Sequence, residues 1–219
     1  MRAAVLGAND GLVSNLSLVM GVAGAELPSA TILITGIAGL LAGALSMAMG
    51  EWISVQSSRE LYAHQIDVER FEIATMPELE TEELALIYRA KGVPAAEARA
   101  LAERFMSDED TALEAMAREE LGIDPDELGG SAAVAAVASF VPFTIGAAVP
   151  VVPFVFLSGT AATATSVAAS AGCLFLLGSA ITLLTHRGVL RAGTRQLLIG
   201  LAAAAVTFAI GRLVGVEIA

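Results

Sequence analysis

The chain has 219 residues, of which 56% are hydrophobic and 16% charged, with a mean hydropathy of +0.73 and a formal net charge of −11. This composition excludes an ordinary soluble globule and indicates an integral membrane protein. The single cysteine, Cys173, excludes an internal disulfide.

Several apolar segments are long enough to cross a bilayer, since a span needs about 20 residues at about 1.5 Å rise each. Five segments qualify, at about residues 5–26, 31–56, 131–151, 154–184 and 190–214. The first is not expected to be a cleaved signal peptide, because it carries polar residues such as Asp10 and a second span follows directly. The sequence therefore predicts an all-α integral membrane protein with five transmembrane helices.

The spans are rich in small residues. Gly7 and Gly11 are four apart in the first span, and Gly39 and Gly43 are four apart in the second. This spacing lets helix backbones approach closely, within a bundle or between subunits.

The first two spans also contain carboxylates. Asp10 lies in the first, and Glu51 lies near the end of the second, one turn after Met47. An ionisable group in hydrocarbon is costly and usually functional, and the rise per residue brings all three to a similar depth. We expect them to line one cation site. Two alternatives stay open: Asp10 pairs with a polar neighbour such as Asn15, and Glu51 lies at the interface beside Trp52.

The acidic residues concentrate between the second and third spans. Residues 60–127 contain 19 Asp and Glu against 6 Lys and Arg, a net charge of −13. So acidic a segment is a poor partner for nucleic acid and a good one for cations. The predicted organisation is thus 1–58 for the first two membrane helices, 59–128 for a cytosolic acidic domain and 129–219 for membrane helices three to five.

This acidic segment has the pattern of helices, and no strand pattern competes. Residues 57–74 lack Gly and Pro and are predicted to continue the second span. Thr75 and Glu78 form a capping-box pattern that restarts the helix, and Pro94 opens another. Ser107 and Gly122 bracket the last one.

Candidate metal ligands in the segment come in pairs three or four residues apart, so each pair shares a helix face. The pairs are Glu69 and Glu72, Glu80 and Glu83, and Met116 and Glu120. Carboxylates alone suit Mg²⁺, Ca²⁺ or Mn²⁺, whereas an added thioether favours Fe²⁺ or other transition metals. The alternative is a solvated acidic face with Met116 in a core.

Basic residues set the expected orientation. Arg2 and Arg59 flank the first two spans, and Arg187, Arg191 and Arg195 lie between the last two. The rule that basic loops stay inside places the N-terminus and the acidic segment in the cytoplasm and the C-terminus outside. Eleven arginines against one lysine favour a bacterial plasma (inner) membrane.

Three stretches resemble a known family. They are ANDGLVSNLSLVMGVAG at residues 8–24, GALSMAMGEWIS at 43–54 and MAREELG at 116–122. Together they resemble the vacuolar iron transporter family, also called the calcium-sensitive cross-complementer family, and the likeness extends over essentially the whole chain.

The resemblance implies a homodimer with five membrane helices per subunit and a cytosolic helical metal-binding domain inserted between helices two and three. It implies export of Fe²⁺, and in many members Mn²⁺, from the cytosol in exchange for protons. By position, Asp10 and Met47 correspond to ligands of the ion in transit, with Glu51 beside the pore or proton path. The cytosolic ligands would be Glu69, Glu72, Glu80, Glu83, Met116 and Glu120.

Two other classes of function remain open. A membrane-tethered di-iron oxidase or storage module would typically use Glu-x-x-His pairs, but the acidic segment's only histidine, His64, has no glutamate three residues before it. A metal sensor would use the membrane helices mainly as an anchor, which has no need of Asp10.

Overall fold

The computed structural model describes residues 2–124, 130–185 and 188–218, and these residues form helices and connecting turns without a strand. The chain divides into two compact units. One unit combines Met1–Trp52 with Ala133–Ala219, and the other is Ile53–Ala132. The all-helical class predicted from the sequence is confirmed for the described residues.

The first two helices are α1 (Arg2–Gly24) and α2 (Ser29–Thr75). The connection between them contains Pro28 and a left-handed residue, Glu26, at φ 59°. The 47 residues of α2 form one unbroken helix, so the predicted continuation beyond the second span is confirmed. This continuity follows from the absence of Gly and Pro between residues 51 and 75.

The remaining helices of the first unit are α6 (Ala132–Ala148), α7 (Pro153–Phe156), α8 (Gly159–Thr185) and α9 (Val189–Ile218). The span predicted at about residues 154–184 is present as α8 but begins later than expected, because Leu157 is extended and Gly159 adopts φ +62°. Only Gly takes such an angle without strain, so the one-turn α7 ends there and α8 starts anew.

Four helices are long and apolar enough to cross a membrane by length and composition: Ala4–Gly24, Ser29–Thr75, Gly159–Ala180 and Val189–Gly215. The predicted third span, 131–151, forms only the 17-residue α6. It ends before Pro150, whose ring nitrogen has no hydrogen to donate to a helical bond. The described residues therefore identify a multi-pass membrane protein with four clear candidate spans and one shorter apolar helix.

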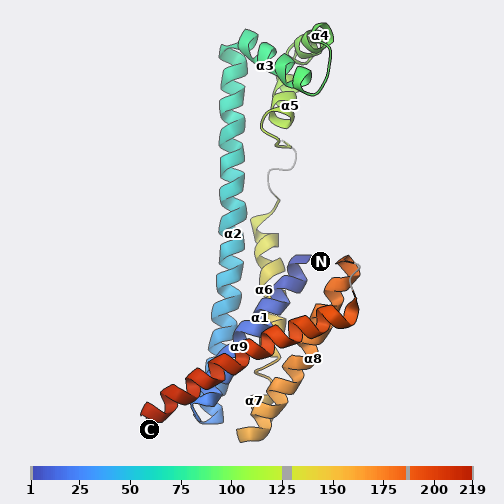
Figure 1. The fold of residues 1–219 in the computed structure, drawn as a ribbon. Coiled ribbons are helices and arrows are strands. Elements are labelled where there is room, and N and C mark those ends of the chain that lie inside the picture. Colours follow the sequence, from blue (N-terminus) through green and yellow to red (C-terminus); the bar gives the residue numbers. More distant parts are fainter. Residues whose placement is uncertain (1, 125–129, 186–187, 219) are drawn as a thin grey trace. The chain divides into compact units, whose positions relative to one another are not determined.

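In this unit α1 packs lengthwise against α9 and also contacts α8, and α8 and α9 contact each other (Figure 1). Their shared core includes Leu12, Leu16 and Leu174, all fully buried. Close approach depends on small residues: a Cβ on Gly24 would clash with the backbone of Phe208.

The second unit contains the lower-hydropathy end of α2 with α3 (Pro77–Ala90), α4 (Ala95–Phe105) and α5 (Glu109–Glu119) (Figure 1). Apolar side chains of these helices pack against one another in a small core. Its members include Ile73 of α2, Leu84 and Tyr88 of α3, and Met116 of α5.

The residues that cap the helices of this unit agree only partly with the prediction. The capping box at Thr75 is wrong, because the Thr75 hydroxyl donates to the Phe71 carbonyl and Met76 precedes α3 without a side-chain cap. Asp108, rather than Ser107, caps α5 by accepting from the backbone N–H of Thr111 at 3.0 Å. Pro94 stands at the start of α4 as predicted.

Candidate metal sites

Three glutamates of the acidic unit converge from three different segments. Glu69 lies on α2, Glu80 lies on α3 and Glu120 follows the end of α5. Each offers a carboxylate oxygen, and these three oxygens all lie within 4.8 Å of one another. The small core of this unit brings the segments together, since Ile73, Leu84 and neighbours of Glu120 pack in it.

Two of these carboxyl groups are buried. Glu69 is 2% exposed and Glu80 is 6% exposed, whereas Glu120 is open to solvent. One carboxyl oxygen of Glu69, Oε1, is buried and has no hydrogen-bond partner. An unpartnered buried oxygen is costly unless a ligand satisfies it.

Burial and mutual repulsion change the protonation of the group. The pKa of Glu69 is raised from 4.5 to about 8, first by burial and then by the negative charges of Glu120, Glu80 and Glu72. Burial also raises the pKa of Glu80 and of Glu120, and Glu83 adds to both shifts. A hydrogen bond between Glu69 and Glu120 raises the pKa of the former and lowers that of the latter. Burial and repulsion therefore favour a protonated form of this group near neutral pH.

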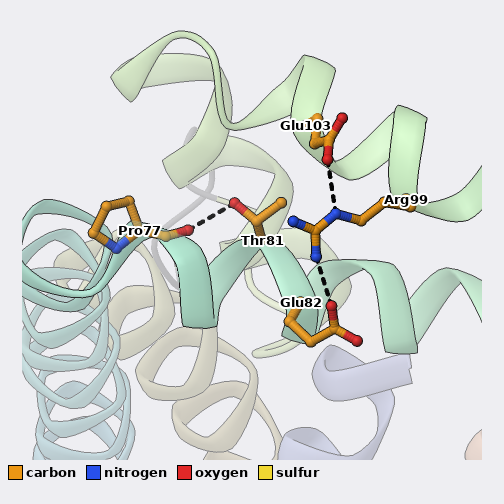
Figure 2. A network of polar contacts seen from close by, with 5 residues as sticks. All are labelled: Pro77, Thr81, Glu82, Arg99 and Glu103. Carbon is orange, nitrogen blue, oxygen red and sulfur yellow. Dashed lines mark hydrogen bonds and ion pairs between the residues drawn. The ribbon is translucent and has the colours of Figure 1, made fainter.

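Basic side chains of the described residues pair with other acids. Figure 2 shows Arg99 of α4 between Glu82 of α3, at 2.6 Å, and Glu103, at 2.8 Å. Arg118 pairs with Glu114 and Asp124, and Lys91 pairs with Glu119. Within the described parts of the chain these ion pairs involve acids outside the Glu69 group, so the repulsion within that group is relieved by protons or by a cation.

The structure separates the six predicted ligands of this unit into two sets. Glu69, Glu80 and Glu120 form the close group, and Glu72 and Glu83 lie near enough to raise its pKa values. The sixth, Met116, is fully buried and belongs to the apolar core. Its role as a ligand stays a prediction.

In the membrane unit, Asp10 and Met47 line one cavity of about 300 Å³. The other lining residues come from α1, α2 and α6: Ser14, Asn15, Leu18, Gly39, Gly43, Ser46 and Phe143. Gly39 and Gly43 make room for it, because a Cβ on either would clash with side chains of α1 or α6. Glu51 and Trp52 are exposed and are not among the lining residues.

The sequence predicts Asn15 only as an alternative partner for Asp10. The structure instead buries its amide, which donates from Nδ2 to the carbonyls of Gly36, at 3.1 Å, and Ala147, at 2.7 Å. Asn15 lies on the same helix as the buried residues Leu12, Leu16 and Val19, at a spacing close to theirs. This spacing is the feature of the sequence that could have indicated its burial.

The whole chain has recognisable relatives. The model of the VIT family matches residues 1–212. The chain belongs to the VIT family. The family resemblance predicted from the sequence motifs is thereby confirmed, and metal transport rather than enzymatic catalysis is the activity associated with it.

Individual relatives of the family agree with this assignment. "Vacuolar iron transporter homolog 1" of Oryza sativa subsp. japonica is 36% identical over 218 residues, 99% of this chain and 75% of the relative. "Vacuolar iron transporter 1" of Arabidopsis thaliana is 30% identical over 218 residues, 98% of this chain and 86% of the relative. "Vacuolar iron transporter" of Acanthamoeba castellanii is 42% identical over 123 residues, 56% of this chain and 43% of the relative. These eukaryotic names give no support to the predicted bacterial plasma membrane.

Proposed function

We propose that the protein exports Fe²⁺, and also Mn²⁺, from the cytosol in exchange for protons, and that the acidic unit captures the metal. The observation that carries this proposal is the convergence of Glu69, Glu80 and Glu120, whose oxygens lie within 4.8 Å of one another and two of which are buried. Such a group holds protons near neutral pH and releases them to the solvent when a divalent cation binds, which supports proton–metal exchange.

The cargo would bind first at this glutamate group. Glu72 and Glu83 would add negative charge around it, and Met116 would supply a softer ligand that favours Fe²⁺. The net charge of −13 over residues 60–127 would raise the local cation concentration.

The path across the membrane would begin at the cavity lined by Asp10 and Met47. A carboxylate and a thioether together can replace part of the hydration shell of a transition-metal ion. Glu51, which is exposed one turn beyond Met47, would serve the entry or the proton path.

In this proposal α6 is the third of five membrane helices, and the acidic unit is cytoplasmic. With 17 residues, α6 is at the lower limit of length for a span. The functional protein would be a homodimer in which the small-residue faces also serve contacts between subunits. The relatives that are named for vacuoles leave the bacterial plasma membrane as a hypothesis from composition alone.

The test is metal uptake into proteoliposomes that carry an internal pH dye and an imposed proton gradient, with anaerobic Fe²⁺ and with Mn²⁺. We expect metal entry to drive proton exit, and Asp10→Asn to abolish both. Metal binding without gradient-dependent flux would contradict the transporter and favour a membrane-anchored sensor or storage module. A ferroxidase assay on the same sample separates the di-iron alternative.

A further inference from the structure

The amide of Asn15 is held in one orientation at the wall of the membrane cavity. Its Nδ2 donates to two backbone carbonyls, those of Gly36 on α2 and Ala147 on α6. A rotated amide would turn its oxygen toward these two acceptors, so the contacts determine which end faces them. The side-chain oxygen therefore points away from both carbonyls.

The Ala147 carbonyl is available for this contact because of how α6 ends. Pro150 follows the helix, and the N–H of Val151 donates to the Ala148 carbonyl rather than to Ala147. An orphan carbonyl in the last turn of a helix needs another donor, which Asn15 supplies. The break after α6 thus contributes to fixing the amide.

The oxygen of this amide, Oδ1, is buried and has no hydrogen-bond partner. Asn15 is 2% exposed and lines the cavity together with Asp10, Met47 and Gly39. A Cβ built on Gly39 would be only 2.8 Å from Oδ1 and closer still to Leu18 Cδ2, so the backbone of α2 passes close to the oxygen at this glycine. A buried amide oxygen without a donor is destabilising, and a bound cation would offset that cost.

We propose that Asn15 Oδ1 is a ligand for the divalent metal ion in the membrane cavity, together with Asp10 and Met47. This inference rests on the proposed transport function. The site would then offer one charged oxygen, one neutral oxygen and one thioether. A neutral oxygen binds the cation without adding a second negative charge that would retain it, so the ion can leave toward the far side.

The experiment measures KM and maximal rate for Mn²⁺ uptake into proteoliposomes, together with the thermal midpoint of each variant in detergent. Asn15→Leu removes both the donor and the oxygen. Asn15→Asp removes the donor, keeps an oxygen and adds a negative charge, which should lower the maximal rate by retaining the ion. We expect both to lower the thermal midpoint, and Asn15→Leu alone to raise KM by about tenfold. Equal KM changes in the two variants, or none in Asn15→Leu, would show a structural role and overturn the proposal.

A second variant covers the case in which the Asn15 variants do not fold. Gly39→Ala leaves the amide in place and adds a methyl group close to Oδ1 and to Leu18 Cδ2, so KM should rise several-fold, while the thermal midpoint reports the displacement of Leu18. Its control, Gly172→Ala, adds the same methyl group on α8 where nothing lies within 4 Å, and should leave KM unchanged. An unchanged KM in Gly39→Ala would contradict the ligand assignment. Absence of flux from the wild-type protein would instead contradict the proposed function itself.

Discussion

At the scale of single residues, Glu69 combines features that rarely occur together on one side chain. It is 2% exposed, it has an unpartnered oxygen, and its pKa is raised to about 8. Burying a carboxyl group in this way reduces stability, so its retention indicates a function other than packing.

Glu69→Gln tests this function directly. The amide is similar in size but carries no charge, so metal affinity of the purified protein should fall by at least about tenfold. Isothermal titration with Mn²⁺ in detergent measures the change. Glu82→Gln is the matched control, because Glu82 lies on α3 but pairs with Arg99 outside the close group. Equal affinity for both variants and the wild type would remove Glu69 from the site.

Met47 gives a prediction about selectivity. Met47→Leu nearly conserves volume in the cavity but removes the thioether, so uptake of Fe²⁺ should fall more than uptake of Mn²⁺. If the loss of the thioether costs the Fe²⁺ complex about 1 kcal/mol more than the Mn²⁺ complex, the ratio of the two uptake rates changes by about fivefold. Competition uptake in proteoliposomes measures that ratio.

The control for this change is Met20→Leu, which alters a methionine in the apolar core rather than in the cavity. It should leave the ratio of the two rates unchanged. A ratio that stays constant in Met47→Leu as well would mean that the thioether does not contact the ion.

At the scale of elements, glycine determines how closely α1 and α6 cross. A Cβ on Gly146 would overlap the carbonyl oxygen of Ala8, and a Cβ on Gly11 would overlap that of Phe143. Helix backbones in direct contact leave no side chain that can move aside, so even one methyl group must displace a whole helix.

Gly146→Ala should therefore lower the free energy of unfolding by about 1 to 3 kcal/mol, the range typical of overpacked sites. Because α1 and α6 both line the cavity, transport should fall as well. Thermal midpoints in detergent measure the first effect. Gly172→Ala, which meets open space, should be neutral or slightly stabilising through helix propensity. A Gly146→Ala midpoint equal to that of Gly172→Ala would contradict the close crossing.

Helix class and the length of α2 could be predicted from the sequence because they depend on local pattern. Hydropathy and the absence of Gly and Pro from residues 51 to 75 were enough. The break between α7 and α8 was missed, because Leu157 and Ser158 look like ordinary span residues and only the backbone angle of Gly159 reveals the new start. The predicted caps at Thr75 and Ser107 are wrong for different reasons: the Thr75 hydroxyl donates back to the Phe71 carbonyl, and Asp108 rather than Ser107 accepts from the N–H of Thr111.

The sequence was enough to predict which residues belong to the candidate sites, but not which of them lie together in space. The sequence spacing predicts pairs of ligands on single helices. In the structure the close group instead contains one glutamate from each of three segments. Such convergence depends on the packing of the core around Ile73 and Leu84, which local spacing does not specify. Asn15 was missed as a cavity residue for the same reason, since its partners Gly36 and Ala147 are far away in sequence.

At the scale of the whole molecule, charge and apolar surface are separated along the chain. Residues 60–127 contain 19 of the 23 acidic residues, whereas the apolar 18-residue window of each candidate span contains at most two charged residues. Most carboxyl groups that can exchange protons for metal therefore lie in the acidic segment.

The stability of the metal-free protein should consequently decrease as the pH rises from about 5 to 8. Glu69 has a pKa of 4.5 in the unfolded chain and about 8 when folded, so between these values the folded state binds more protons than the unfolded state. The stability that this proton provides is fully present below pH 4.5 and is lost as the pH rises through about 8. The raised pKa values of Glu80 and Glu120 act in the same direction.

Thermal unfolding of the full chain in detergent with a chelator, between pH 5 and pH 8, measures this trend. Added Mn²⁺ should raise the midpoint more at pH 8 than at pH 5.5, because at the lower pH the ion must displace protons from the glutamates. In Glu69→Gln the decrease should be smaller, since the folded and unfolded forms no longer differ at this residue. A midpoint that rises toward pH 8 without metal would mean that Glu69 is ionised in the folded protein, and proton exchange at this group would then have no basis.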